Sequence, residues 1–389
     1  MPGRIKSVVS GPGLLFVSLS LVALYAPFMT LAANRIVAGE GIPVWDVAGP
    51  EAVIPGFAGL LAGLVLGLPA AWQVLRLTGA MIGIAALIWL LMEGSTSLLE
   101  GAGTYARVSL GSGFWCLLAI LLLLAADALS SLSPGPKMRG ALLAVAIVVS
   151  ALVLWSGALT DLSIFREYAS RQDAFFNAAW RHLGLAFGSL VVAAAIGFPL
   201  GVYCHRNEGL RSAVLPVLSF LQTIPSLAMF GIMIPLLAWV SSTIPGAKEL
   251  GVVGIGFLPA FLALVIYSLL PVVANTVAGL EATPIVTLDA ARGMGMTRHQ
   301  RLIQIQLPLG LPVMLAGLRI VLVQNIGLAV IAGLIGGGGF GTFVFQGLNQ
   351  TATDLILLGA LPTVILALIS AITMDILVEL ARPNQMRHR

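Results

Sequence analysis

Residues 281–308, EATPIVTLDAARGMGMTRHQRLIQIQLP, form a polar, charged island between two long apolar segments. Thr283 followed by Pro284 predicts a helix start, because a side-chain oxygen can cap the first turn and proline fits its first position. A short helix is expected over residues 285–292. Gly295 supplies a stop, since glycine readily adopts the left-handed backbone that ends many helices. The island therefore predicts a small amphipathic helix at the edge of a membrane.

The spacing within this island resembles the EAA loop of ABC-importer permeases, E-A-A-x3-G-x9-I-x-L-P. The corresponding residues are Asp289, Ala290, Ala291, Gly295, Ile305, Leu307 and Pro308. Asp289 is the one departure, because Asp keeps the charge of the usual Glu but shortens its reach. The resemblance implies that this loop couples the membrane subunit to a cytoplasmic ABC ATPase.

Composition places the chain in a membrane. Of its 389 residues, 59% are hydrophobic and only 9% are charged, and the mean hydropathy is +1.03. These values lie far outside those of soluble globular proteins. The formal net charge is only +4, and no basic patch interleaved with aromatic residues occurs, so no nucleic-acid partner is expected. Cys116 and Cys204 lie in or at the end of apolar runs, which argues against a disulfide framework.

The apolar runs predict an all-α, polytopic helical membrane protein with about ten transmembrane helices. The first run, residues 14–33, is longer than a signal-peptide core and no convincing cleavage site follows it. The other runs begin near Ala52, Leu77, Leu110, Gly140, Leu183, Val214, Gly251, Pro312 and Leu355. The run that begins at Leu77 is short for a span.

The distribution of cations tests this count, because each added span would reverse the orientation of everything after it. A cytoplasmic N-terminus leaves six cations outside and one, Arg319, within a span. The six are Arg35, Arg107, Arg166, Arg171, Arg181 and Lys248. Thirteen lie inside: Arg4, Lys6, Arg76, Lys137, Arg139, Arg206, Arg211, Arg292, Arg298, Arg301, Arg382, Arg387 and Arg389. Both ends of the chain and the 281–308 loop are therefore expected in the cytoplasm.

A boundary is expected at residues 161–182, a polar stretch of mixed charge predicted to lie outside. Its aromatic residues favour an amphipathic helix on the membrane surface, and a partner-binding surface is the alternative. Residues 1–160 would be an N-terminal extension of about five transmembrane helices. By resemblance, residues 183–383 would be the C-terminal five-helix core of a type I, MetI-like ABC permease.

Further stretches narrow the resemblance to osmoprotectant permeases. They are residues 222–228 (QTIPSLA), 256–260 (GFLPA), 293–297 (GMGMT) and 334–341 (LIGGGGFG). The long N-terminal extension looks like that of the larger Yeh-type permease subunit. The resemblance implies a bacterial inner membrane protein that imports glycine betaine, choline or carnitine. Its implied partners are an ABC ATPase, an exported substrate-binding protein and a second permease subunit, either the same chain or a shorter paralogue.

Two polar groups within spans are candidates for the translocation pathway. The first is Gln222, Thr223, Pro225 and Ser226, where proline frees backbone carbonyls that a cavity tolerates and lipid does not. A structural kink bonded to neighbouring helices is equally consistent with this group. The second is Gln324 and Asn325, which are costly to bury without partners. Arg319 either snorkels to the interface or pairs with Asp375 or Glu379.

Catalytic and nucleotide-binding chemistry is not expected. The glycine run 336–341 lacks the Lys-Ser/Thr of a phosphate loop and lies at the outer end of a span, so a turn or gate is expected. ATP and Mg would be bound by the partner subunit. The histidines have no metal-ligand spacing, and no intramembrane hydrolase arrangement is evident.

The expected function is a non-catalytic permease subunit that couples ATP hydrolysis by a separate subunit to osmoprotectant import. The alternatives are an ABC permease for methionine or another amino acid and, from a different class, an ion-driven secondary transporter. The latter would need acidic residues near mid-membrane, whereas Asp127, Asp375 and Glu379 fall towards cytoplasmic ends.

Overall fold

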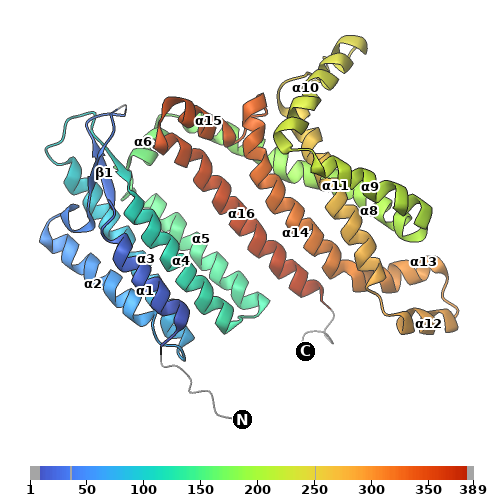
Figure 1. Ribbon diagram of the computed structural model, residues 1–389, viewed down its shortest axis with the longest axis horizontal. Coiled ribbons are helices and arrows are strands. Elements are labelled where there is room, and N and C mark those ends of the chain that lie inside the picture. The colour runs from blue at the N-terminus through green and yellow to red at the C-terminus, as the bar shows by residue number, and fades with distance from the viewer. Residues whose placement is uncertain (1–8, 36, 250, 383–389) are drawn as a thin grey trace. The chain divides into compact units, whose positions relative to one another are not determined.

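The computed structural model describes residues 9–35, 37–249 and 251–382 (Figure 1). Both ends of the chain, predicted to be cytoplasmic, lie outside the described residues. The chain divides into two compact units, Met1–Met138 with Ala144–Ser170 and Arg139–Leu143 with Arg171–Arg389. Each unit is built mainly of long apolar helices, because a helix satisfies all of its backbone hydrogen bonds within one segment.

The first unit combines helices with a small sheet. Its helices are α1 (Gly11–Ala23), η1 (Val44–Asp46), α2 (Pro50–Leu66), α3 (Gln73–Leu99), α4 (Ser112–Leu132), α5 (Pro136–Trp155) and α6 (Ser163–Ala169). Its strands are β1 (Met29–Ala32), β2 (Glu40–Ile42) and β3 (Arg107–Leu110). They form one antiparallel sheet in the order β2-β1-β3, with Met29 opposite both Ile42 and Leu110.

The expectation of a single span over residues 14–33 is wrong in its second half. Helix α1 ends at Ala23 and the chain becomes extended in β1. Pro27 follows closely and cannot donate a helical hydrogen bond, which explains why the helix does not continue. Hydropathy alone does not distinguish the buried strand from more helix, because Met29 is as apolar and as buried as a core helical residue.

Small residues allow the helices of the first unit to approach closely. A Cβ added at Gly63 of α2 would lie 2.6 Å from the carbonyl oxygen of Gly79 on α3. Close approach of backbones at such positions is the usual basis of helix packing in membranes. At one end of these helices the buried Arg76 guanidinium pairs with Asp127 of α4 and donates to the Gly67 carbonyl at 3.1 Å.

The second unit is a helical bundle. Its elements are α7 (Gln172–Leu183), η2 (Gly184–Gly188), α8 (Ser189–Arg206), α9 (Glu208–Thr223), α10 (Ser226–Thr243), α11 (Phe257–Glu281), α12 (Ile285–Gly293), α13 (Arg298–Arg301), η3 (Leu302–Gln306), α14 (Leu307–Ile331), η4 (Ala332–Ile335), α15 (Gly341–Gln350) and α16 (Thr353–Ala381). η2 and η3 are π-helical turns, so α7 runs into α8 and α13 into α14 without a break.

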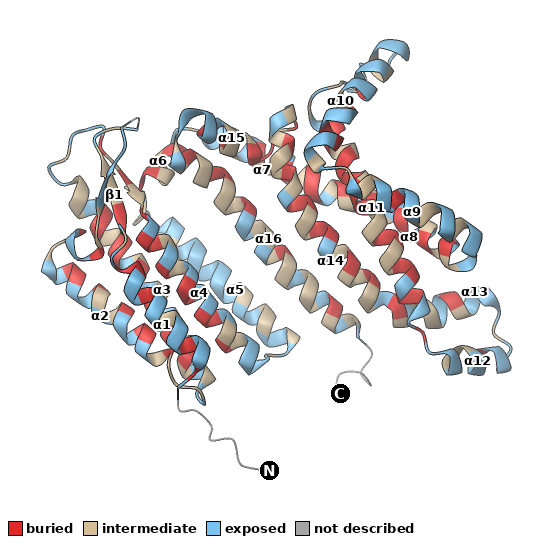
Figure 2. Cartoon of the chain, in the orientation of Figure 1, coloured by how far each residue is buried: buried red, intermediate tan, exposed pale blue. Residues whose placement is uncertain are grey.

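Helix α11 is the centre of this bundle, with α8 and α14 against it and α16 on the far side of α14 (Figure 1). Figure 2 shows many buried residues along α11. At one contact between α11 and α14, a Cβ on Gly310 would lie 2.5 Å from the Gly279 carbonyl oxygen.

Eight helices of the described chain are long and apolar enough to cross a membrane, and α1 and α2 are shorter apolar helices. All ten predicted apolar runs therefore contain a helix, and the all-α polytopic fold is confirmed. Two further details differ from the expectation. The run that begins at Val214 is divided at Pro225 between α9 and α10, and the amphipathic helix α15 is an additional element.

Candidate functional site

The 281–308 loop projects from one end of the second unit and carries two short helices, α12 and α13 (Figure 1). Helix α12 begins at Ile285, close to the predicted start. The predicted cap is wrong, because Pro284 occupies the N-cap position. The Thr283 side chain instead turns inward, and its hydroxyl has no hydrogen-bond partner among the described residues.

Helix α12 has one buried position and an exposed surface. Ala291 is fully buried, whereas Ala290 is exposed. Asp289 accepts a hydrogen bond from Arg292 at 2.7 Å, and both side chains remain more than half exposed. The carboxylate of Asp289 therefore faces solvent and is held in place by its own helix.

Large apolar side chains also face outward on this loop. Val286 is 81% exposed, and Ile285 and Met294 are each 74% exposed. Such a group on a polar loop is typical of a surface that another protein covers.

Gly295 turns the chain after α12. Its φ is +76°, and a Cβ built there would meet nothing within 4 Å. The requirement for glycine is therefore one of backbone conformation, since other residues are strained in this region. A capping box between Thr297 and Gln300 then starts α13. This Thr-x-x-Gln pattern was visible in the sequence and marks a helix that the expectation did not include.

The remaining loop residues connect α13 to the bundle. Ile305 lies in the π-turn η3, and Leu307 and Pro308 begin α14. Leu307 packs with Phe198 and Val202 of α8, beside a core of Leu280, Leu302 and Met314. Polar contacts brace the same end of the unit. Arg211 pairs with Glu281, and the Gln306 amide lies 3.2 Å from the His205 ring. The base of the loop therefore contacts α8, α11 and α14.

The first pathway candidates lie together at the break between α9 and α10. The Gln222 amide donates to the Tyr267 carbonyl at 2.6 Å, and the Tyr267 hydroxyl donates to the Ile224 carbonyl. The carbonyl next to Pro225 is therefore satisfied by α11. Thr223 and Pro225 are exposed, and Gln222 and Ser226 are half-buried.

Asn325 lies at the centre of a hydrogen-bond cluster that joins three helices. It is fully buried, and its amide nitrogen donates to the hydroxyls of Ser189 on α8 and Ser268 on α11, both at 2.9 Å. Each serine also donates to a carbonyl of its own helix, Ser189 to Leu185 and Ser268 to Leu264. Sequence reasoning missed the two serines, because a single hydroxyl in a helix usually bonds only its own backbone.

Gln324 faces a different environment from its neighbour. It lines a cavity of about 660 Å³ together with Arg319 and Asp375. Arg319 pairs with Asp375 at 2.5 Å, so pairing with α16 is the arrangement found among the alternatives. The other pathway candidates, Gln222, Thr223, Pro225 and Ser226, are not among the residues that line this cavity.

The glycine run lies at the opposite end of the unit from α12 (Figure 1). Gly336, Gly338 and Gly339 have positive φ, and Gly341 packs against the Val330 carbonyl so closely that no Cβ would fit. A cavity of about 660 Å³ lies between this run, α7 and α15, and includes Arg171 and Arg181.

These features define a multi-pass membrane protein of the permease class. Residues 178–386 match the family described as binding-protein-dependent transport system inner membrane component, and residues 10–165 match the N-terminal domain of the ABC transporter permease YehY. The chain therefore belongs to the family of binding-protein-dependent transport system inner membrane components. It is a multi-pass inner membrane protein and a permease subunit of an ABC importer, a transport component that does not itself hydrolyse ATP.

Several relatives are similar to this chain over about half of its length or more. The carnitine transport permease protein OpuCB of Listeria monocytogenes is 38% identical over 190 residues, which cover 49% of this chain and 80% of the relative. The osmoprotectant import permease protein OsmW of Salmonella typhimurium is 40% identical over 190 residues, which cover 49% of this chain and 83% of the relative. The osmoprotectant import permease protein OsmY of the same organism is 36% identical over 227 residues, which cover 58% of this chain and 87% of the relative. A solved structure of the MetNI methionine ABC transporter is 22% identical with a TM-score of 0.47, and the match covers 54% of this chain and 97% of that one.

Proposed function

We propose that this chain is the permease subunit of an importer for quaternary-amine osmoprotectants such as glycine betaine, choline or carnitine. The relatives named for carnitine and osmoprotectant transport support this substrate class. So does the fact that the match covers most of each relative's length. The transported solute is then a small cation or zwitterion whose charge must be shielded from lipid along the pathway.

The coupling role is carried by the exposed helix α12. The apolar side chains of Ile285 and Val286 on α12, and of Met294 directly after it, are exposed at a loop whose base contacts α8, α11 and α14. We propose that a cytoplasmic ATPase, which binds ATP and Mg, covers this surface. Asp289, Ala290, Ala291 and Gly295 would shape the docked helix, and Ile305, Leu307 and Pro308 would join it to α14.

The pathway is proposed to run along the α9–α10 break. Gln222, Thr223, Pro225 and Ser226 lie at a partly exposed position of this unit, where a second permease subunit, either this chain or a shorter paralogue, would complete the passage. An exported substrate-binding protein would deliver the solute at the outer end. Gln324 is retained as a pathway candidate because it lines a cavity. Asn325 is better placed as a clamp between helices.

The domain roles are part of the same proposal. Residues 183–383 would be the transport core, residues 161–182 an external linker, and residues 1–160 an extension with its own role. With both termini in the cytoplasm, α12 and α13 face the ATPase.

The test is uptake of a labelled quaternary amine in cells that lack other osmoprotectant importers. Uptake should require this chain together with its ATPase and binding protein. Labelled methionine is the matched control. Uptake of methionine with none of betaine, choline or carnitine would overturn the proposed substrate class. Uptake that persists without any ATPase would point instead to an ion-driven transporter. The ion pairs of Asp127 and Asp375 with arginines argue against an ion-driven transporter, because a carboxylate paired with an arginine is not free to bind a proton or a sodium ion.

A further inference from the structure

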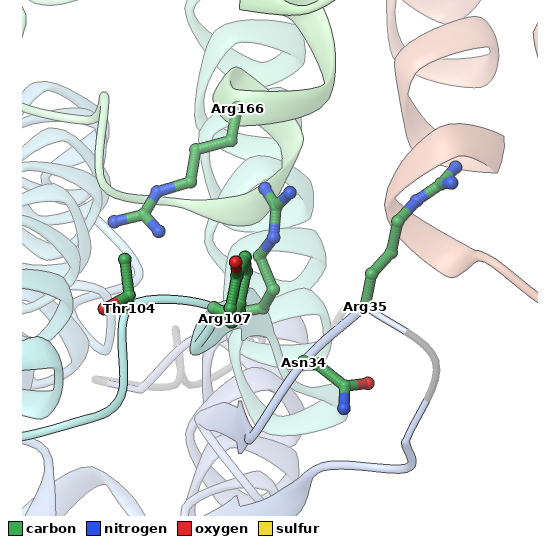
Figure 3. A pocket seen from close by; sticks show the side chains of 6 residues that line it. Asn34, Arg35, Thr104, Arg107 and Arg166 are labelled. Carbon is green, nitrogen blue, oxygen red and sulfur yellow. The ribbon is translucent and has the colours of Figure 1, made fainter.

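The first unit contains a basic pocket whose lining residues are not among those proposed for coupling or for the translocation pathway. It has a volume of about 250 Å³ and is lined by Asn34, Arg35, Thr104, Tyr105, Arg107 and Arg166 (Figure 3). Three of these six residues are arginines, and none is acidic. The same three arginines are the cations of this unit that the charge pattern places outside the membrane.

The sheet builds this pocket from three separate stretches of the chain, residues 34–35, residues 104–107 and Arg166. Strand β1 pairs with β3 so that Ala32 lies opposite Arg107, which brings residues 34 and 35 beside the end of β3. A bridge between Val108 and Leu162 then places α6, with Arg166, against the same end of the sheet. In Figure 3 the Arg166 side chain reaches from α6 towards Thr104, and the Arg107 guanidinium extends beside it. The convergence is thus a product of the fold rather than of neighbouring positions in sequence.

Acidic residues balance only part of the charge of this pocket. Glu167, which is buried, pairs with Arg35 at 2.7 Å. Asp161 lies 3.6 Å from Arg166, whose guanidinium also donates to the Ala106 carbonyl at 3.2 Å. For Arg107, the buried Nη1 has no hydrogen-bond partner among the described residues. A buried N–H of a cation without an acceptor is unfavourable, so this atom points to an anionic ligand.

We propose that this pocket binds a single oxyanion group, a carboxylate or a phosphate. The planar guanidinium presents paired N–H donors that match the geometry of both groups. Arg107 would bind the oxyanion directly, Arg166 would add a second cation, and the Thr104 hydroxyl and the Asn34 amide would supply neutral polar contacts. The residues that line this pocket lie in the first unit and are not among those proposed for the pathway of the transported solute.

The same oxyanion chemistry is available from a soluble anion or from a lipid headgroup, and the test separates them. The full chain is placed in phosphatidylcholine nanodiscs and titrated calorimetrically with inorganic phosphate, with chloride used to keep the ionic strength constant. Saturable binding is expected. Arg107→Gln should weaken it roughly tenfold or more, the loss expected for a charge-assisted hydrogen bond. Arg166→Gln should also weaken phosphate binding, although Arg166 lies on α6 and Arg107 on β3.

Lys248→Gln is the matched control, because Lys248 is an exposed cation of the second unit that does not line the pocket. It should leave phosphate binding unchanged. If phosphate does not bind, the thermal stability of the wild type is compared in discs with and without phosphatidylglycerol. A stabilisation that Arg107→Gln removes and Lys248→Gln retains would assign the oxyanion to the lipid headgroup. No response in either arm, or an equal response of the two variants, would overturn the proposal.

Discussion

At the scale of single residues, Asn325 shows how one buried amide can connect three helices. Its amide nitrogen donates to hydroxyls on α8 and α11 from its place on α14. We predict that Asn325→Leu lowers the stability of the detergent-solubilised chain by about 1 kcal/mol, a usual value for side-chain hydrogen bonds between membrane helices. The loss is limited because Ser189 and Ser268 keep their bonds to carbonyls of their own helices.

The measurement for Asn325 is thermal unfolding, and the neighbouring Gln324→Leu is the control. Gln324 lines a cavity rather than the three-helix cluster. Its substitution should leave the midpoint of unfolding unchanged while lowering uptake. If both variants lose the same stability, the cluster around Asn325 does not act as a clamp.

At Gly295 the structure gives one reason for the requirement for glycine, which is the conformation of the backbone. The backbone there is left-handed and the surrounding space is open. We predict that Gly295→Val costs roughly 1–2 kcal/mol of local strain and displaces α12. Uptake and ATP hydrolysis stimulated by the loaded binding protein should then fall in reconstituted vesicles. Gly295→Asn should retain both activities, because Asn tolerates this conformation. Equal loss in the two variants would show that the side chain, and not the backbone, is the obstacle.

At the scale of elements, the apolar runs predict the helices well, because length and hydropathy decide which segments can cross a membrane. The elements they miss have other causes. The sequence of β1 is as apolar as that of a membrane helix. It forms a strand because it pairs with β3, which is distant in sequence. At the division before Pro225, the Ile224 carbonyl accepts a hydrogen bond from the hydroxyl of Tyr267, 43 residues further along the chain. The loop spacing predicts which residues take part in coupling, but it does not predict that Ala291 is buried.

Helix α12 allows a direct test of docking at this scale. We predict that Val286→Asp removes association with the ATPase, because a charge would be buried in an apolar contact. Val286 is 81% exposed in the chain alone, so insertion and folding should be unaffected. The measurement is the amount of ATPase that co-purifies with the tagged permease.

Val286→Ile is the control for this experiment, since it keeps the surface apolar and should retain the ATPase. Normal co-purification with Val286→Asp would mean that the exposed side chains of α12 face something other than the ATPase.

At the scale of the whole molecule, the ends of the second unit can be compared with the charge pattern. The contacts between Arg211 and Glu281 and between Gln306 and His205 place the α8–α9 connection at the same end as the 281–308 loop. Five cations predicted to be cytoplasmic, Arg206, Arg211, Arg292, Arg298 and Arg301, therefore belong to one end of the bundle. Arg171 and Arg181, predicted to be outside, line the cavity by the glycine run at the other end. The fold therefore places the two predicted groups of cations at opposite ends of the bundle, as the positive-inside rule requires. Which end faces the cytoplasm is then the property to be measured.

The last prediction fixes that direction. Cys116 and Cys204 are the two free cysteines, and replacing both gives a background for single cysteines at Gln172, Lys137 and His299, which are all exposed. Intact cells treated with an impermeant thiol reagent should label only the cysteine at position 172. Those at 137 and 299 should react after permeabilisation, because the excess of Lys and Arg keeps their loops in the cytoplasm. Labelling of position 299 in intact cells would reverse the orientation, place α12 out of reach of a cytoplasmic ATPase, and remove the basis of the proposed coupling.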